Sequence, residues 1–411
     1  MKFDICVVGL GYIGLPTASI FAARGKRVYG LEVNPRVVAT INGGDIHIVE
    51  PDLDVLVRAA VQSGNLVAGT IPVEAETFII AVPTPFQHAS GDPVPDLSYV
   101  ESASRSIAGK VAPSSLVILE STSPVGTTEK VKEWVDGERA RLGLPATPGA
   151  HYVHCPERIL PGQMLKEIVT NDRLCGGLTP AAAERARDLY RVFCNGEIHT
   201  TDARTAEMVK LTENSSRDVQ IAFANELSLI CDRLGISVWE VIRLANRHPR
   251  VKILQPGPGV GGHCIAVDPW FIVHSAPDLA QLIRTARQVN DQKPAWVVDR
   301  VKGLASRLKE PVVACLGLAF KADVDDLRES PSVQIAEALA HLPGVSLLVD
   351  EPNVNELPVP LRKANVRKVA AAEAIAGADV VVLLVNHRQY LSLDRDLLRD
   401  KVVIDTRGIW S

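Results

Sequence analysis

Short apolar runs alternate with longer amphipathic stretches through the first 200 residues of the chain. Short, nearly uncharged runs are typical of buried parallel strands, and the stretches between them are long enough for helices. We predict a first helix over residues 15–24, and strands over 3–8, 27–31, 78–82, 116–119 and 152–155. The alternation indicates an open, mostly parallel sheet, which binds ligands at the carboxyl ends of its strands.

The alternation restarts at Pro311, after a long helical pattern over residues 204–234 that Gly235 ends. Here we predict a helix over 331–342 and strands over 311–316, 345–349, 380–385 and 401–404. The expected fold class is therefore α/β, with two doubly wound Rossmann-like domains joined by a helical middle region with a long bridging helix. The expected domain boundaries are 1–200, 201–300 and 301–411. The apolar face of the long helix predicts a subunit interface, and hence a homodimer.

Composition narrows the class of protein. The chain has 411 residues, of which 46% are hydrophobic, enough for real cores. Its formal charge of −4 comes without a basic block, which argues against a nucleic-acid partner. No apolar stretch reaches the roughly 18 residues of a membrane span, and no signal peptide is apparent. The seven cysteines include no C-x-x-C pair, as expected of reduced thiols. We therefore expect a cytoplasmic protein without a membrane partner.

Residues 9–14 read Gly-Leu-Gly-Tyr-Ile-Gly and lie between the first predicted strand and helix. In this context the glycines permit a tight turn, close approach of a pyrophosphate and packing of the helix on the strand. Glu32 ends the second strand, where a carboxylate accepts hydrogen bonds from ribose hydroxyls and repels a 2′-phosphate. The pattern predicts NAD as the cofactor. The residues expected to bind it are Gly9, Gly11, Tyr12, Ile13, Gly14, Glu32, Thr84 and Thr122.

A glycine-rich loop at 257–262 is followed closely by Cys264. Glycines admit a ligand close to the backbone, so a thiol here is a candidate nucleophile, and Asp268 lies four residues on. The alternative is that Cys264 is a small buried hydrophobe.

Other polar residues carry weaker local signals. Lys210 and Asn214 are four apart on the long helix and can point into one pocket, or they can form a solvated face. Glu157 follows a strand end and can be a base or merely cap a turn. His151, His154 and Cys155 are metal-ligand types, but strand alternation prevents them from converging, so we expect no metal.

Six motifs in order resemble the UDP-glucose/GDP-mannose dehydrogenase family over essentially the whole chain. They are residues 8–16, 121–126, 155–158, 210–214, the Cys264 loop, and 320–321 with 326–331. The resemblance implies an NAD-binding first domain, a dimerising middle and a UDP-sugar-binding last domain. The stretches 44–52, 245–250 and 262–270 resemble the branch that oxidises UDP-N-acetyl-D-mannosamine, with UDP-GlcNAc and UDP-glucose as alternatives.

The resemblance also implies a four-electron oxidation of the sugar 6-hydroxyl. Cys264 would capture the aldehyde as a thiohemiacetal that is oxidised to a thioester. Lys210 and Asn214 would stabilise the oxyanions, and Glu157 would be the base for hydrolysis, with Asp268 and Thr122 holding the water. Many members carry a second glutamate four residues after the first; that position is Pro161 here.

The family pattern also implies a set of substrate contacts. Lys321 and Arg328 would neutralise the negative charge of the diphosphate. Arg250 would reach into the partner subunit's site unless it is an ordinary surface charge. The substrate-binding residues implied are Glu157, Arg158, Lys210, Asn214, Arg250, Gly261, Lys321 and Arg328.

Two other functions fit parts of the sequence. One is a single-step hydroxyacid-type dehydrogenase, which needs no cysteine and no second α/β domain. The other is an NAD-sensing regulator without turnover. The number of NADH molecules formed per substrate separates them from the four-electron enzyme.

Overall fold

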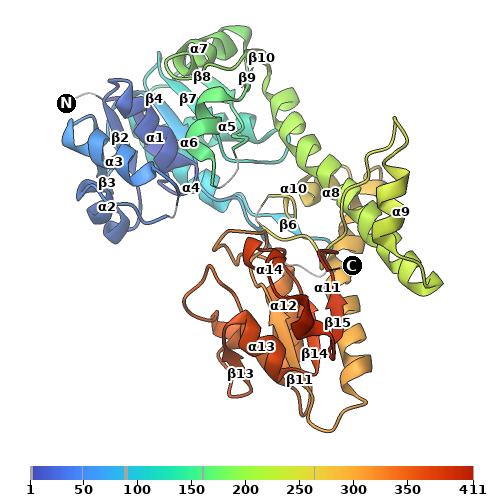
Figure 1. Cartoon of the computed structure of the whole chain (residues 1–411). Helices are drawn as coiled ribbons and strands as arrows, with labels where there is room; N and C mark the ends of the chain where they lie inside the picture. Colours follow the sequence, from blue (N-terminus) through green and yellow to red (C-terminus); the bar gives the residue numbers. More distant parts are fainter. Residues whose placement is uncertain (1–2, 49, 88–90, 160–161, 263, 411) are drawn as a thin grey trace. The chain divides into compact units, whose positions relative to one another are not determined.

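The computed structural model describes residues 3–48, 50–87, 91–159, 162–262 and 264–410, which form two compact units, 1–213 and 214–411 (Figure 1). The long helix α8 (Ala203–Leu234) runs through the division between them. The predicted long helix is therefore confirmed; the Asp202 carboxylate caps it by accepting from Thr205 N at 2.9 Å, and Gly235 follows it with φ +70°. The three-domain division stays a prediction.

The first unit contains an eight-stranded sheet in the order β10-β9-β8-β7-β4-β1-β2-β3. The strands are β1 (Phe3–Val8), β2 (Val28–Leu31), β3 (Leu66–Gly69), β4 (Ala75–Ile80), β7 (Leu116–Leu119), β8 (His151–His154), β9 (Arg173–Gly177) and β10 (Ile198–Asp202). The helices are α1 (Gly14–Ala23), α2 (Pro35–Asn42), α3 (Leu53–Gln62), α4 (Ser98–Ile107), α5 (Thr127–Arg141), α6 (Met164–Thr170) and α7 (Pro180–Tyr190). A short hairpin joins β5 (Phe86–Gln87) and β6 (Val94–Pro95).

Six strands of this sheet, β3-β2-β1-β4-β7-β8, are parallel in the order expected for a doubly wound dinucleotide-binding fold. Apolar clusters pack on both faces of the sheet, because both faces of the strands are buried. The structure departs from the expected parallel alternation at β9, which pairs antiparallel to β8. Since β10 is parallel to β9, the last two strands run against the other six.

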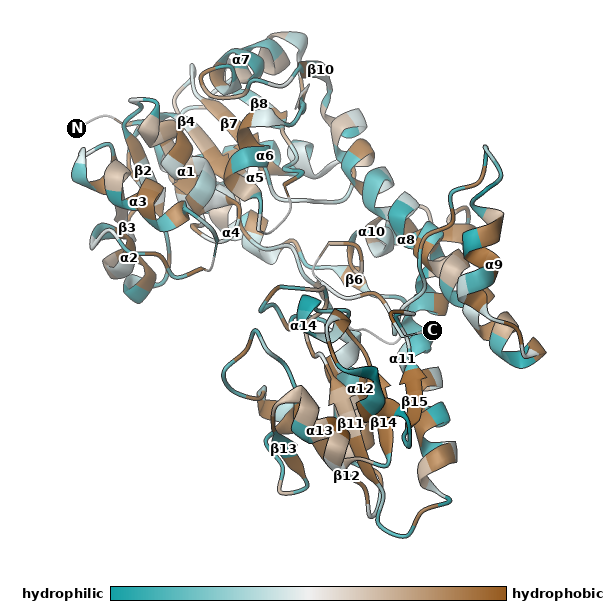
Figure 2. Cartoon of the chain, in the orientation of Figure 1, coloured by the Kyte–Doolittle hydropathy of each residue, from teal (hydrophilic) through white to brown (hydrophobic). Residues whose placement is uncertain are grey.

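The second unit begins with the rest of α8 and contains a five-stranded parallel sheet in the order β13-β12-β11-β14-β15. Figure 2 shows β11 and β14 in brown, as expected for strands with apolar clusters on both faces. The helices are α9 (Val238–Ala245), α10 (Asp268–Ser275), α11 (Gln281–Ala305), α12 (Pro331–Ala340), α13 (Ala371–Gly377) and α14 (Arg388–Leu391). The strands are β11 (Val312–Leu316), β12 (Ser346–Asp350), β13 (Val366–Lys368), β14 (Val380–Leu383) and β15 (Val402–Asp405). The predicted α/β fold class is confirmed.

The first turn of each sheet is built in the same way. Gly9 has φ +88° and donates its N–H to Leu31 O at 2.8 Å; Gly317 has φ +89° and donates to Asp350 O at 2.8 Å. Only glycine adopts such a φ at little cost. The turns then differ, because α1 begins five residues after Gly9 whereas α12 begins only at Pro331.

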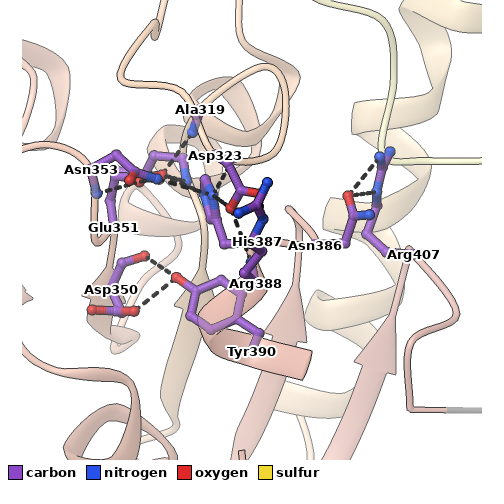
Figure 3. A network of polar contacts seen from close by, with 11 residues as sticks. Ala319, Asp323, Asp350, Glu351, Asn353, Asn386, His387, Arg388, Tyr390 and Arg407 are labelled. Atoms are coloured by element: carbon purple, nitrogen blue, oxygen red, sulfur yellow. Dashed lines mark hydrogen bonds and ion pairs between the residues drawn. The ribbon is translucent and has the colours of Figure 1, made fainter. Parts of the chain in front are cut away.

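Glu351 holds the second turn closed (Figure 3). Its side chain is 1% exposed, and Oε2 accepts from the backbone N–H of Leu318 at 2.7 Å and of Ala319 at 2.9 Å. His387 Nε2 lies 3.1 Å from the same oxygen. Burial alone would raise the pKa of Glu351, but the hydrogen bonds from His387 and the backbone outweigh it and lower the pKa.

We expect Glu351→Ala to destabilise the second unit by about 3 kcal/mol, because it leaves at least two buried backbone donors without an acceptor. Glu356→Ala is the matched control, since that carboxylate is 79% exposed and only forms a surface ion pair with Arg362. Urea denaturation of both variants measures the difference. Equal midpoints for the two would contradict the structural role of Glu351.

Candidate active site

The first glycine turn has the space and the donors for a dinucleotide. A Cβ at Gly14 would lie 1.9 Å from Gly9 O, so only glycine lets α1 begin so close to the turn. A Cβ at Gly11 would meet no atom within 4 Å, so the space beside that residue is open. The N-terminal turn of α1 therefore suits a pyrophosphate, and the residues fit NAD.

Glu32 lies beside this turn at the end of β2. Its Oε2 accepts from Leu10 N at 3.1 Å and its Oε1 from Asn34 N at 3.0 Å, which fixes the carboxylate while leaving it half-buried. Tyr12 and Ile13 are also half-buried. A fixed, partly exposed carboxylate at this position can accept ribose hydroxyls.

The ends of β4 and β7 are joined by a hydrogen bond from Thr84 Oγ1 to Thr122 O at 2.6 Å. Two residues that the sequence predicts at the cofactor site therefore lie together at the carboxyl edge of the sheet.

Glu157 lies opposite Arg173 because of the strand reversal. The antiparallel register pairs Val153 with Gly177, and continuing it past the strand ends pairs Glu157 with Arg173. Arg173 Nη2 lies 2.6 Å from Glu157 Oε2, and both side chains are buried. The other oxygen of Glu157 accepts from the N–H of Arg158 at 2.8 Å.

Glu120, at the end of β7, is a second buried carboxylate near the same guanidinium. Its Oε1 lies 4.0 Å from Arg173 Nη1 and accepts from the Tyr190 hydroxyl at 2.6 Å, while Oε2 accepts from Thr17 Oγ1 at 3.2 Å. The pKa of Glu120 is raised to about 7, mainly by burial, which Arg173 opposes and the charge of Glu157 reinforces.

Lys210 extends from α8 within the first unit and is 8% exposed. Its ammonium makes no hydrogen bond or ion pair to any residue that the structure describes. Burial, aided by the nearby Lys210 charge, lowers the pKa of His154 to about 3, so this histidine is neutral. The Arg158 guanidinium, in contrast, donates hydrogen bonds to the Glu213 carboxylate at 2.9 Å and to Asp172 O at 2.5 Å.

In the second unit, Cys264 is half-buried just before α10, and the other cysteines are buried. Its carbonyl accepts from the N–H groups of Val267 and Asp268, at 3.0 and 2.8 Å, which fixes the backbone that carries the thiol. Asn214 Nδ2 donates to the buried Asp268 carboxylate. His263 lies outside the described residues, as does Pro161 of the first unit.

The glycine loop packs closely on the segment that carries Lys321 and Arg328. A Cβ at Gly261 would lie 2.6 Å from Glu329 O and 2.8 Å from Phe320 Cβ, and Gly262 N donates to Arg328 O at 3.2 Å. Lys321, Arg328 and Arg250 are exposed, and the Arg328 guanidinium also pairs with Asp326 at 2.6 Å.

Among the described residues, no group of three or more His, Cys, Asp and Glu side chains is arranged to hold a metal ion. No helix within the described ranges is long and apolar enough to cross a membrane.

Three consecutive domains of one family match the chain. The NAD binding domain of the UDP-glucose/GDP-mannose dehydrogenase family matches residues 3–194, the central domain 204–292 and the UDP binding domain 314–411. The chain belongs to this family. It is an NAD-dependent nucleotide-sugar dehydrogenase, which confirms the predicted family, enzyme class and cofactor.

Individual relatives match this chain over nearly its whole length. The NDP-N-acetyl-D-galactosaminuronic acid dehydrogenase of Ralstonia nicotianae is 57% identical, over 99% of this chain and 96% of its own. The UDP-N-acetyl-D-mannosamine dehydrogenase of Escherichia coli is 55% identical, over 99% of each chain. The structure of the UDP-N-acetyl-mannosamine dehydrogenase Cap5O from Staphylococcus aureus matches with a TM-score of 0.87 at 41% identity, over 100% of this chain and 95% of that one.

Sequence reasoning missed Glu120, Arg173 and the Glu351–His387 pair. Glu120 carries a usable signal, because it is the first residue after the apolar run of β7. Arg173 carries none, since its place at this edge depends on the reversed direction of β9.

We expect the enzyme to use NAD with a kcat/KM roughly a hundredfold above that for NADP, because a carboxylate at the predicted ribose position would accept its hydroxyls and repel a 2′-phosphate. Glu32→Gln should reduce this ratio, and steady-state kinetics with both cofactors measures it. A wild-type ratio near one would show that Glu32 does not contact the ribose.

Proposed function

We propose that this enzyme oxidises the 6-hydroxyl of UDP-N-acetyl-D-mannosamine to the carboxylate in two successive steps, through a thioester on Cys264. The observation that carries the proposal is the half-buried Cys264 on its fixed backbone, in a chain that is 55% identical to the Escherichia coli enzyme over nearly its full length. NAD, when bound, accepts a hydride in each of the two oxidations.

Lys210 is proposed to act on the hydroxyl oxygen in the first oxidation, in which the hydroxyl proton passes to water as the hydride leaves. A buried ammonium without an anionic partner among the described residues is available to stabilise an alkoxide. The Cys264 thiolate then adds to the aldehyde carbon, and its S–C bond persists when the second hydride leaves. Asn214, held by Asp268, is the proposed second donor to the oxyanion.

Hydrolysis returns the enzyme to its starting state. A water oxygen attacks the thioester carbon, Glu157 takes the water proton, and Cys264 leaves as a thiolate with the electron pair of the broken bond. We propose that Asp268 and Thr122 help to hold this water. Arg158, Gly261, Lys321 and Arg328 are proposed to bind the rest of the UDP-sugar.

A galactosamine-type substrate is the second candidate. The Ralstonia relative, named for N-acetyl-D-galactosaminuronic acid, is 57% identical to this chain, slightly more than the 55% of the Escherichia coli relative. The two candidates share the N-acetyl group and the chemistry at carbon six.

The cellular setting remains part of the proposal. We propose a cytoplasmic homodimer in which Arg250, exposed in this chain, completes the partner's site, and a product used for surface polysaccharide.

The substrate proposal predicts the outcome of a screen with UDP-ManNAc, UDP-GalNAc, UDP-GlcNAc, UDP-glucose and GDP-mannose. UDP-ManNAc should have the highest kcat/KM and UDP-glucose a value at least roughly a hundredfold lower, because a site with unmatched polar groups discriminates strongly. A preference for UDP-GalNAc would support the second candidate, and turnover of none would favour an NAD-binding regulator.

The mechanism predicts two NADH per sugar and no free aldehyde. Cys264→Ala should lower uronate formation by roughly a thousandfold or more, because the nucleophile is lost. Cys315→Ala, at a buried cysteine of the second unit, is the control and should leave the rate near wild type. NADH absorbance and product mass measure both. One NADH per sugar would indicate a single-step dehydrogenase, and near-normal uronate from Cys264→Ala would exclude the thioester route.

A further inference from the structure

Arg173 and Glu120, which surround Glu157, have no part in the proposed function as stated above. We propose that Arg173 and Glu120 are positioning residues for Glu157, setting the orientation and basicity of this base during thioester hydrolysis. The inference rests on the role of Glu157 in the proposed function and deepens it.

Arg173 is held so that its two amino groups face different carboxylates. Nη2 pairs with Glu157 at 2.6 Å, and Nη1 lies 4.0 Å from Glu120. The guanidinium carbon lies 4.6 Å from the centre of the Tyr190 ring and 5.2 Å from that of Phe193. Aromatic faces on the cation, together with 3% exposure, leave it no solvent-exposed alternative.

Glu120 is equally fixed. It is 2% exposed, and both of its oxygens accept hydrogen bonds, from Tyr190 and from Thr17 on α1. The titratable groups that face it are Arg173, Glu157 and Tyr190. Burial holds the pKa of Tyr190 well above its ordinary value, so the phenol remains a donor.

One buried cation therefore serves two buried carboxylates. Its single charge compensates fully for only one anion, so the ionisation of Glu120 and that of Glu157 oppose each other. An anionic Glu120 competes for Arg173 and makes Glu157 a stronger base, whereas a neutral Glu120 leaves the guanidinium to Glu157.

The test isolates hydrolysis by rapid quench, with the Cys264 thioester measured by mass spectrometry across pH. In Glu120→Gln we expect the midpoint of the acid limb of the pH–rate profile for hydrolysis to move to lower pH by about one pH unit. The plateau rate should fall about threefold, because Glu157 becomes a weaker base. In Arg173→Lys hydrolysis should slow about tenfold, because one ammonium cannot serve both carboxylates. The first hydride transfer should change less than twofold in both variants.

Arg139→Lys is the matched control for a buried arginine of the same unit. Its guanidinium is 6% exposed and donates only to backbone carbonyls, those of Ala108, Val111 and Pro145. A merely structural role for Arg173 or Glu120 would lower the melting temperature and slow all steps together, as we expect for this control, without moving the pH midpoint.

Glu157→Gln separates the two levels of the proposal. If it hydrolyses the thioester at the wild-type rate, both the base and this inference are wrong. If it stalls while Glu120→Gln keeps the wild-type pH profile, only this inference is overturned. Should Arg173→Lys fail to fold, the near-isosteric Glu120→Gln decides alone.

Discussion

The antiparallel pairing of β9 with β8 is the constraint on which the first unit's site depends. In a uniformly parallel sheet, the first residue of a strand lies at the edge opposite the ligand site. Because β9 runs in reverse, its first residue, Arg173, lies at the edge where β7 and β8 end and meets Glu157 in register. Cys155 and Cys175, two residue pairs closer to the ladder, have sulfurs 4.0 Å apart, in agreement with this register. A buried carboxylate at a strand end needs such a partner, since an uncompensated buried charge is costly.

The two glycine turns have the same local structure but different roles. Each places a glycine at φ close to +90° after the first strand and a glutamate at the end of the second strand. Glu32 accepts one backbone donor of its turn and remains partly exposed, so it has capacity left for ribose hydroxyls. Glu351 accepts two backbone donors of its turn and a third from Asn353, contacts His387, and is buried. Its hydrogen-bonding capacity is used within the protein, and the segment after the second turn instead supports the loop of Cys264 through Phe320 and Glu329.

Most of the fold could be predicted because apolar runs and helix-capping residues in the local sequence indicate its strands and helices. The strand over 116–119 matches β7 at both ends, and Ser330 with Pro331 marks the start of α12, where Ser330 caps the helix. The candidate site was predicted only in part, through Glu32, Glu157 and the Cys264 loop, whose motifs are contiguous in sequence. Arg173 could not be found in this way, because apolar runs do not record whether a strand is parallel or antiparallel. The pairing of Glu120 with Arg173 likewise joins residues from separate strands.

The proposed role of Lys210 depends on how the fold buries its charge. Two buried arginines have a carboxylate partner, Arg173 with Glu157 and Arg287 with Asp218, whereas Arg139 donates only to backbone carbonyls. Lys210 is buried without such a partner among the described residues, beside a histidine that burial keeps neutral. Taking an ammonium out of water without an anion is unfavourable, and the folded state carries this cost when the site is empty. In the mechanism that we propose, an alkoxide or oxyanion forms next to Lys210 and would remove this imbalance. The attraction would then be greatest when the substrate oxygen carries negative charge, which would favour the charged intermediate over the neutral alcohol.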